Sequence, residues 1–172
     1  MGVELKKTMT ITRIAIALAG VAFSSLCICL EAADNALDKF PAGYRQWVHV
    51  KSALIGPQFP MFATEGGIHH VYANDKAMQG LRTGQFPDGS ILVYDLLETT
   101  ENGGVTAEGT RRRVDIMRKD SKAYSDSGGW WFGRFMGNDR QNEMLTPEHR
   151  AACFTCHQKR EKQGFVFSEF RE

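Results

Sequence analysis

Two cysteines and a histidine stand close together near the end of this 172-residue chain, in the segment Cys153-Phe154-Thr155-Cys156-His157. On a helix, residues three and four positions apart lie on one face. Cys153, Cys156 and His157 can therefore all reach one flat group. The Cys-X-X-Cys-His spacing is the attachment signature of haem c, in which both thiols bind the haem covalently and the histidine is an axial iron ligand. We expect one covalent haem c per chain.

The alternatives are a redox dithiol and half of a zinc site. A structural zinc ion needs four ligands, and no second cysteine pair follows the N-terminal apolar segment. A thioredoxin-like dithiol is expected near a βαβ pattern, which this sequence lacks. The histidine directly after the second cysteine favours haem.

The residues around the signature predict a helix from about Pro147 to Gln163. Thr146 is a good N-cap, and proline at the first helical position loses nothing by having no N–H. Gly164 is a typical C-terminal stop.

Residues 1–33 are typical of an export signal, with a basic start followed by the uncharged, mostly apolar stretch Ile14–Leu30. We expect it to be cleaved, with Asp34 near the mature N-terminus; an uncleaved membrane anchor is the alternative. Cleavage removes Cys27 and Cys29 and leaves only the haem cysteines. The protein is then expected in the periplasm.

The remaining residues, 34–172, are expected to form a single soluble domain. The whole chain has a formal net charge of +1, and 42% of its residues are hydrophobic. This near-neutral balance gives no case for binding nucleic acid.

Hydrophobic patterning predicts an α+β fold, a predominantly antiparallel sheet with a few helices and a C-terminal haem-binding helix. Asn74 is expected to cap a helix over residues 76–82, residues 55–67 to form a loop, and residues 44–54 to be either helix or strand. Strands are expected over Ile68–Tyr72, Ile91–Leu97, Val105–Met117, Trp130–Phe135 and Phe165–Phe170.

The order of short motifs over nearly the whole mature chain resembles the cytochrome P-460 family. These motifs are Tyr44–Val48, Thr83–Val93, Lys119–Ser121, Gly129-Trp130, the haem signature and Val166–Phe170. The resemblance implies a β-rich antiparallel fold, a homodimer in the periplasm, and a five-coordinate haem c with His157 as its only protein ligand. Active members oxidise hydroxylamine, whereas the related cytochromes c′-beta bind nitric oxide or carbon monoxide.

The sequence departs from the family at one decisive position. Active members link a strand lysine to the haem, but the aligned residue here is Tyr94, and no lysine occurs between Lys76 and Lys119. Tyr94 can form such a link in principle; the alternative, which we favour, is packing in the core or over the haem edge.

Asp115 lies where active members can carry a distal glutamate. A carboxylate above the iron could accept protons from bound hydroxylamine as a general base. The alternative is a solvated strand carboxylate paired with one of the arginines at positions 111–113.

Phe59 and Phe62 are expected to form an apolar wall on the distal side of the haem, because their loop is unusually rich in apolar residues for a loop. Such a wall leaves the iron open to a small ligand. Rival sixth ligands are His49, His69, His70, His149, Met61, Met78, Met117, Met136 and Met144.

The sequence therefore favours a periplasmic haem c protein with an open site for small nitrogen species such as nitric oxide or hydroxylamine. Hydroxylamine oxidation, with a soluble electron acceptor as partner, and simple electron transfer are the alternatives.

Overall fold

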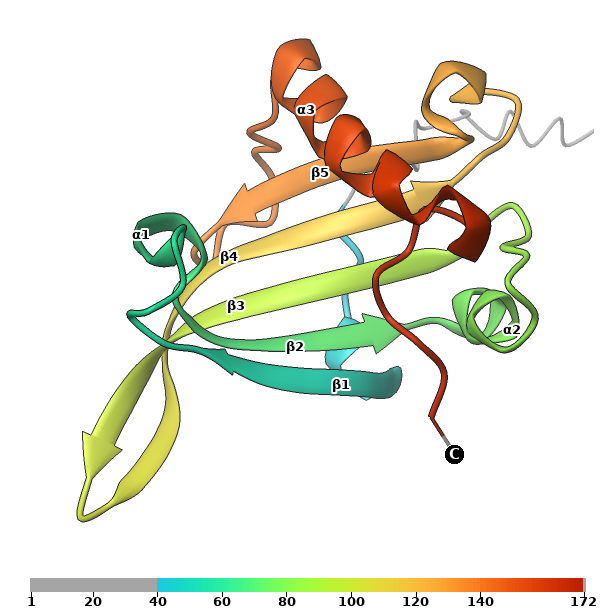
Figure 1. Ribbon diagram of the computed structural model, residues 1–172. Coiled ribbons are helices and arrows are strands. Elements are labelled where there is room, and N and C mark those ends of the chain that lie inside the picture. Colours follow the sequence, from blue (N-terminus) through green and yellow to red (C-terminus); the bar gives the residue numbers. More distant parts are fainter. Residues whose placement is uncertain (1–39, 172) are drawn as a thin grey trace, which may run out of the picture. The chain divides into compact units, whose positions relative to one another are not determined.

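A five-stranded antiparallel sheet forms the centre of the computed structural model, which describes residues 40–171. The export signal expected over residues 1–33 lies outside this range. The strands follow one another across the sheet in chain order (Figure 1). They are β1 (Val48–Ile55), β2 (Gly67–Ala73), β3 (Ile91–Asn102), β4 (Val105–Lys119) and β5 (Trp130–Met136). The predicted α+β fold with a mainly antiparallel sheet is confirmed.

Three α-helices accompany the sheet: α1 (Phe62–Glu65), α2 (Asp75–Thr83) and α3 (Pro147–His157). The 3₁₀ turns η2, η3 and η4 cover Tyr44–Gln46, Ser125–Ser127 and Gln158–Gln163. Within residues 40–171, no helix has the length and apolar character that crossing a membrane requires.

The caps foreseen for the two longer helices are present. The Asn74 side chain accepts a hydrogen bond from the Ala77 N–H at the start of α2. Thr146 does the same for the His149 N–H at the start of α3. Helical structure then continues through η4 to Gly164, whose φ of 65° is the left-handed conformation that ends helices.

The ambiguous segment 44–54 is a 3₁₀ turn followed by strand β1, and the loop expected over residues 55–67 contains the one-turn helix α1. Two arginines of β4 fasten this loop to the sheet. Arg112 donates to the carbonyls of Gly66 and Ala63 at 2.5 and 2.6 Å, and Arg113 donates to that of Thr64 at 2.5 Å.

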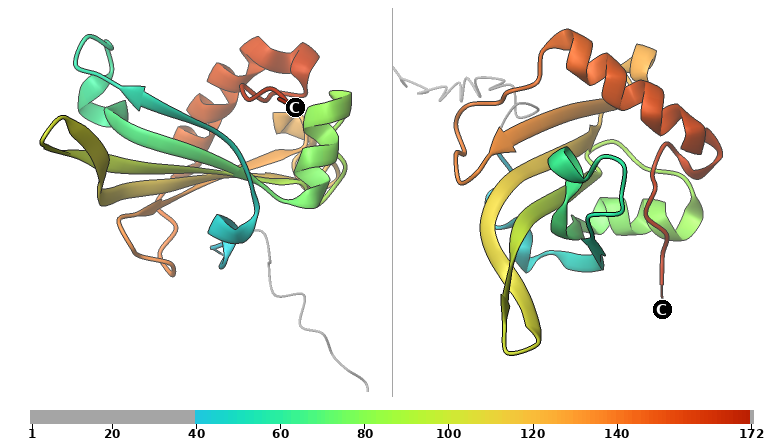
Figure 2. Two further views of the ribbon diagram at one scale, coloured as in Figure 1. Left: turned by 90° about the horizontal axis from the view of Figure 1, so that it is seen from below. Right: turned by 60° about the vertical axis from the view of Figure 1, so that its left-hand side comes forward.

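Each face of the sheet carries its own apolar core. Val71, Leu92 and Phe132 pack with α2, α3 and the C-terminal segment on one face, called here the cavity face. Val93, Ile116 and Phe135 pack with Tyr44 on the opposite face. Figure 2 shows α3 and the C-terminal segment on one side of the sheet and η2 on the other. On β4, Val114 and Ile116 pack in the core of the opposite face, whereas the Met117 side chain packs in the core of the cavity face.

The closing strand expected at Phe165–Phe170 is wrong, because these residues pair with no strand. Phe165 has a φ of 68°, which a strand residue does not adopt. A backbone carbonyl next to this segment accepts a hydrogen bond from a side chain instead of from a strand: Trp130 Nε1 donates to the Gly164 carbonyl at 3.0 Å. The alternating phenylalanines cover the cavity face rather than extend the sheet.

Candidate functional site

A cavity of about 480 Å³ lies on the cavity face of the sheet. This volume is typical of small-molecule and cofactor sites. Its walls come from all five strands, the β1–β2 loop, α3 and the C-terminal segment. The residues foreseen from the sequence that line it are Phe59, Tyr94, Asp115, Cys153, Cys156 and His157.

Helix α3 presents the three residues of the Cys-X-X-Cys-His signature to this cavity. Cys153 is half-buried and packs against the apolar core of the cavity face, while Cys156 is exposed, and both are free thiols. Burial raises the pKa of the Cys153 thiol, and the nearby Asp115 carboxylate raises it further. Both thiols are thus placed for attachment to one group in the cavity.

His157 is oriented by the C-terminal segment. Its Nδ1 lies 2.7 Å from the Phe165 carbonyl oxygen, which only accepts, so the proton is on Nδ1 and Nε2 is left free. The rings of Phe132 and Phe167 lie at 5.0 Å from the imidazole. Burial lowers the pKa of His157, against the effect of the Phe165 hydrogen bond. A neutral imidazole whose second nitrogen is held by a carbonyl is the form that binds iron.

The residues present therefore fit a covalent haem c. The donor set is complete, and it lines one cavity with the apolar side chains of Val71, Leu92 and Val166. Because Nδ1 of His157 is held by the Phe165 carbonyl, Nε2 is the nitrogen that would bind the iron.

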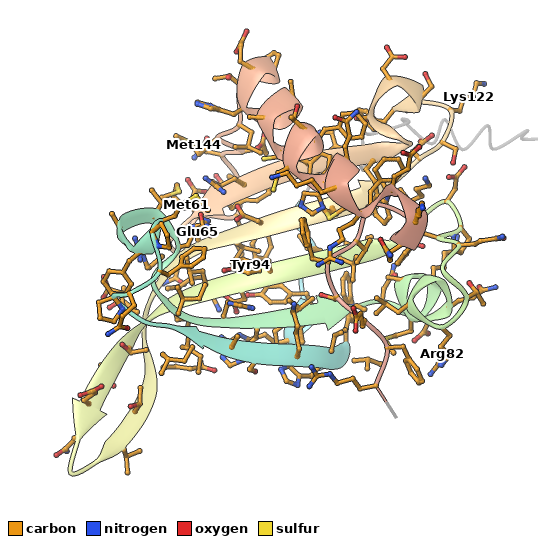
Figure 3. The ribbon with its side chains drawn as sticks, viewed as in Figure 1. Met61, Glu65, Arg82, Tyr94, Lys122 and Met144 are labelled. Atoms are coloured by element: carbon orange, nitrogen blue, oxygen red, sulfur yellow. The ribbon has the colours of Figure 1, made fainter. Side chains whose placement is uncertain are left out.

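Tyr94 and Asp115 occupy directly opposite positions on β3 and β4. Both line the cavity, so the convergence that the sequence left open is present in the fold. Figure 3 shows Tyr94 over the middle of the sheet, with Met61 and Glu65 at the α1 end.

Asp115 is held by two guanidinium groups. Arg113 Nε donates to Oδ2 at 2.8 Å, and Arg134 donates to Oδ1 at 2.5 Å and to Oδ2 at 3.0 Å. The ion-paired alternative for Asp115 is therefore what the structure shows, with Arg134 as an unforeseen second partner. Arg113 also donates to Glu65 at 2.6 Å, which continues the charged network to α1.

Tyr94 packs face to face with His69, with ring centroids 4.5 Å apart and planes inclined by 26°. Burial raises the pKa of the Tyr94 phenol to about 12, and the Glu65 carboxylate contributes to the rise. The phenol is therefore neutral at physiological pH.

Phe59 and Phe62 separate in space. Phe59 lines the cavity, but Phe62 does not; its ring covers Gly66, where an added Cβ would lie 2.4 Å from it. Among the rival ligands, His69, Met61 and Met117 line the cavity. The remaining rivals lie outside its lining: His49, His70, His149, Met78, Met136 and Met144.

Sequence reasoning foresaw Arg113 only as one of three possible partners of Asp115, missed Lys51, Glu65 and Arg134, and gave His69 no special place. Strand alternation carried part of the signal, since His69 and Val71 on β2 share a face. Strand pairing brings these side chains together, and predicting it would have required the register of the sheet.

Comparison with known proteins agrees with this geometry. The family described as Cytochrome P460 matches residues 41–168, which is most of the chain. The chain belongs to the cytochrome P460 family. No curated protein matches it. Membership identifies the protein as a haem cytochrome, and the matched range includes the complete Cys153–His157 signature.

Proposed function

We propose that this cytochrome P460-family protein is a periplasmic mono-haem c protein whose open distal site binds small nitrogen species, nitric oxide or hydroxylamine. The observation that carries the proposal is the orientation of His157, whose Nδ1 is hydrogen-bonded to the Phe165 carbonyl. Cys153 and Cys156 line the same cavity as His157. With His157 as its only protein ligand, a bound haem iron would have a position open to a small molecule.

A bound haem c supplies an iron that can bind such ligands and exchange one electron. The chain's own residues orient and shield it. His157 is held by Phe165, and Phe59 and Met61 provide apolar cover from the β1–β2 loop. Arg112 and Arg113 keep this loop in place over the cavity.

Hydroxylamine oxidation is the second candidate, and the pairing of Tyr94 with Asp115 supports it. In this reading Asp115 accepts a proton from the substrate, and a soluble partner accepts the electrons. The two arginines on Asp115 weigh against it, because their hydrogen bonds already engage both carboxylate oxygens that would have to accept the proton. The absence of a lysine at position 94 also weighs against it. We therefore favour the ligand-binding role.

The test is the optical spectrum of protein matured in a host with a haem-attachment system. We expect one covalent haem by mass spectrometry and a five-coordinate, high-spin resting spectrum that changes on addition of nitric oxide. A six-coordinate, low-spin resting spectrum would favour electron transfer instead. A chain that binds zinc through its thiols and takes no haem contradicts the proposal entirely.

Three variants locate the attachment. The double variant Cys153→Ala/Cys156→Ala should lose the haem, whereas His157→Ala should keep it and lose the native spectrum. His149→Ala is the matched control, because His149 is exposed on the same helix and does not line the cavity. It should retain the wild-type spectrum.

The location and assembly belong to the same proposal. Cell fractionation should find the mature protein in the periplasm, with an N-terminus at or near Asp34. Retention of the full-length chain in the membrane fraction contradicts cleavage. We expect a homodimer, which size-exclusion chromatography with light scattering tests.

A further inference from the structure

Phe165 has a backbone conformation that phenylalanine rarely adopts. Its φ is 68°, and among residues 40–171 all other positive φ angles belong to glycines. The left-handed region is costly for a residue with a side chain, because Cβ comes too close to the following carbonyl oxygen. Such residues persist only where the surrounding structure holds them, and they cluster at functional sites. The conformation of Phe165 therefore indicates a role for this residue.

Both backbone polar groups of Phe165 make hydrogen bonds to α3 or to the turn that follows it. The N–H donates to the Arg160 carbonyl of η4 at 2.8 Å, and the carbonyl accepts the hydrogen bond from His157 Nδ1 at 2.7 Å. Gly164 precedes it with a φ of 65°, so two successive left-handed residues turn the chain back after η4 (Figure 1). The left-handed backbone of Phe165 is thus the conformation in which its carbonyl returns to His157.

The side chain of Phe165 holds this backbone in place. Its ring packs on Phe154, which lies between the two cysteines, with ring centroids 5.6 Å apart. The ring also lies against Gly128, where an added Cβ would be 2.5 Å from Cε2 of Phe165. This close approach is possible only because residue 128 has no side chain.

Gly128 belongs to a turn that is attached to the sheet on both sides. It ends η3 with a φ of 63°, and its carbonyl accepts a hydrogen bond from Lys119 Nζ of β4 at 2.5 Å. In the same turn, Ser127 Oγ donates to the Trp130 carbonyl of β5 at 2.6 Å. The turn is therefore a fixed support for the Phe165 ring.

The hydrogen bond made by the Phe165 carbonyl acts on the nitrogen that would bind the iron. A histidine that donates its second N–H to a carbonyl has a fixed ring orientation and is a more basic metal ligand. A more basic imidazole favours ferric over ferrous iron, so it lowers the reduction potential of a haem.

We propose that Phe165 is a positioning residue for His157, and that Gly128 supports it. The Phe165 ring, packed against Gly128, keeps the backbone left-handed and the carbonyl directed at His157 Nδ1. Contact between the η3 turn and Phe165 thus sets the reduction potential of the bound haem. The inference rests on the proposed function, since it requires His157 to bind the iron.

Gly128→Ala tests the support while leaving His157 and Phe165 unchanged. The added methyl group displaces the Phe165 ring, so the hydrogen bond to His157 weakens. We expect the iron–histidine stretching band of the ferrous protein, measured by resonance Raman, to move to lower frequency. At a fixed potential the ratio of reduced to oxidised haem should rise about three- to tenfold, the equivalent of one ordinary hydrogen bond. This is a shift of about 30–60 mV, since a tenfold change corresponds to about 59 mV for one electron.

Gly103→Ala is the matched control. Gly103 has a similar φ of 58°, but nothing lies within 4 Å of an added Cβ. The control therefore introduces the same backbone strain, in the β3–β4 hairpin, without a contact to Phe165. Its stretching band and potential should match those of the wild type. Wild-type values in Gly128→Ala as well would overturn the inference and leave the proposed function intact.

Two variants of Phe165 separate the ring from the backbone. Phe165→Ala removes the ring but keeps the cost of the left-handed conformation, so the carbonyl should leave His157 and the band should shift at least as far as in Gly128→Ala. Phe165→Gly adopts the left-handed conformation without that cost, so its shift should be smaller. Wild-type values in Phe165→Ala, or a larger shift in Phe165→Gly than in Phe165→Ala, contradict the positioning role.

The wild type gives a measurement that needs no substitution. In its diamagnetic ferrous carbon monoxide complex, the Nδ1 proton of His157 should give an NMR resonance that exchanges slowly with water, because the Phe165 carbonyl holds it. Rapid exchange in the haem-loaded protein overturns the inference alone. A wild type that attaches no haem, or that shows no iron–histidine band, overturns the proposed function and the inference with it.

Discussion

Tyr94 on β3 and Asp115 on β4 are direct cross-strand partners. Both line the cavity that Cys153, Cys156 and His157 also line. A shift of one residue in the β3–β4 register would place one of the two on the opposite face. The pairing places a phenol and a carboxylate on one wall of the cavity that is the candidate haem site.

We expect Tyr94 to carry no link to the haem. Replacing Tyr94 by Phe should then leave the main absorption bands unchanged, because the ring that packs on His69 survives. The absorption spectrum and the mass of the haem peptide test this. A shifted main band together with loss of activity in Tyr94→Phe would instead show a tyrosine–haem link.

Asp115 is expected to stabilise the fold through its two arginines. In Asp115→Ala the buried Arg113 keeps Glu65 but loses Asp115, and Arg134 loses both of its bonds to the carboxylate. We expect the free energy of unfolding to fall by about 2 kcal/mol, since charged hydrogen bonds are stronger than neutral ones. Urea denaturation measures this, with the exposed Asp126→Ala as control. Equal stability of the two variants would contradict it.

The same variant tests Asp115 as a base. A general-base role predicts that Asp115→Ala lowers hydroxylamine oxidation by about a hundredfold or more. The spectrum of the variant must match that of the wild type for the comparison to hold. Turnover equal to that of the wild type would remove Asp115 from the mechanism.

Much of the fold could be predicted because its signals are local. Hydrophobic patterning identified β2, β3, β4 and β5, and the caps Asn74 and Thr146 marked the starts of α2 and α3. The failure at residues 165–170 has a physical reason: alternating phenylalanines can cover a cavity as well as pair in a sheet. The left-handed Phe165 could not be read from the pattern.

The site residues could be predicted only where they lie close together in the sequence. Cys153, Cys156 and His157 share one helix, so spacing sufficed. Arg134 reaches Asp115 from β5, and this contact depends on sheet register. Phe59 and Phe62 are three residues apart, yet the turn before α1 directs only Phe59 into the cavity.

Asp95 is expected to be a stabilising centre on the opposite face. This fully buried carboxylate accepts hydrogen bonds from Tyr44 at 2.6 Å, Arg45 at 2.9 Å and Arg111 at 2.8 Å. Burial alone raises the pKa of Asp95, but the hydrogen bonds from Arg111 and Tyr44 outweigh it and lower the pKa below its usual value.

Replacing Asp95 by Ala should reduce the free energy of unfolding by about 3–5 kcal/mol, the usual cost of removing one partner from a buried charged network. Urea denaturation followed by circular dichroism measures the loss. Glu101→Ala in the exposed β3–β4 hairpin should change stability by less than about 0.5 kcal/mol. A similarly small effect at Asp95 would show that its charge interactions only balance the cost of burying it.

The neutral state of His69 predicts how stability depends on pH. Its pKa is lowered from 6.5 in the unfolded chain to about 4 in the fold, by burial and by the neighbouring Lys51, His70 and Arg113 side chains. Between these values the unfolded chain binds a proton that the folded protein does not, so stability falls as pH decreases from 6.5 towards 4. The full shift corresponds to about 3 kcal/mol.

His69→Phe removes this titration and leaves the other groups in place, so urea unfolding of both proteins at pH 7 and pH 4.5 isolates the contribution of His69. The wild type should lose more stability than the variant on acidification, by about 2 kcal/mol or more. Parallel losses in the two proteins would mean that the imidazole becomes protonated in the fold as readily as in the unfolded chain. That result would contradict a neutral His69 in the cavity wall.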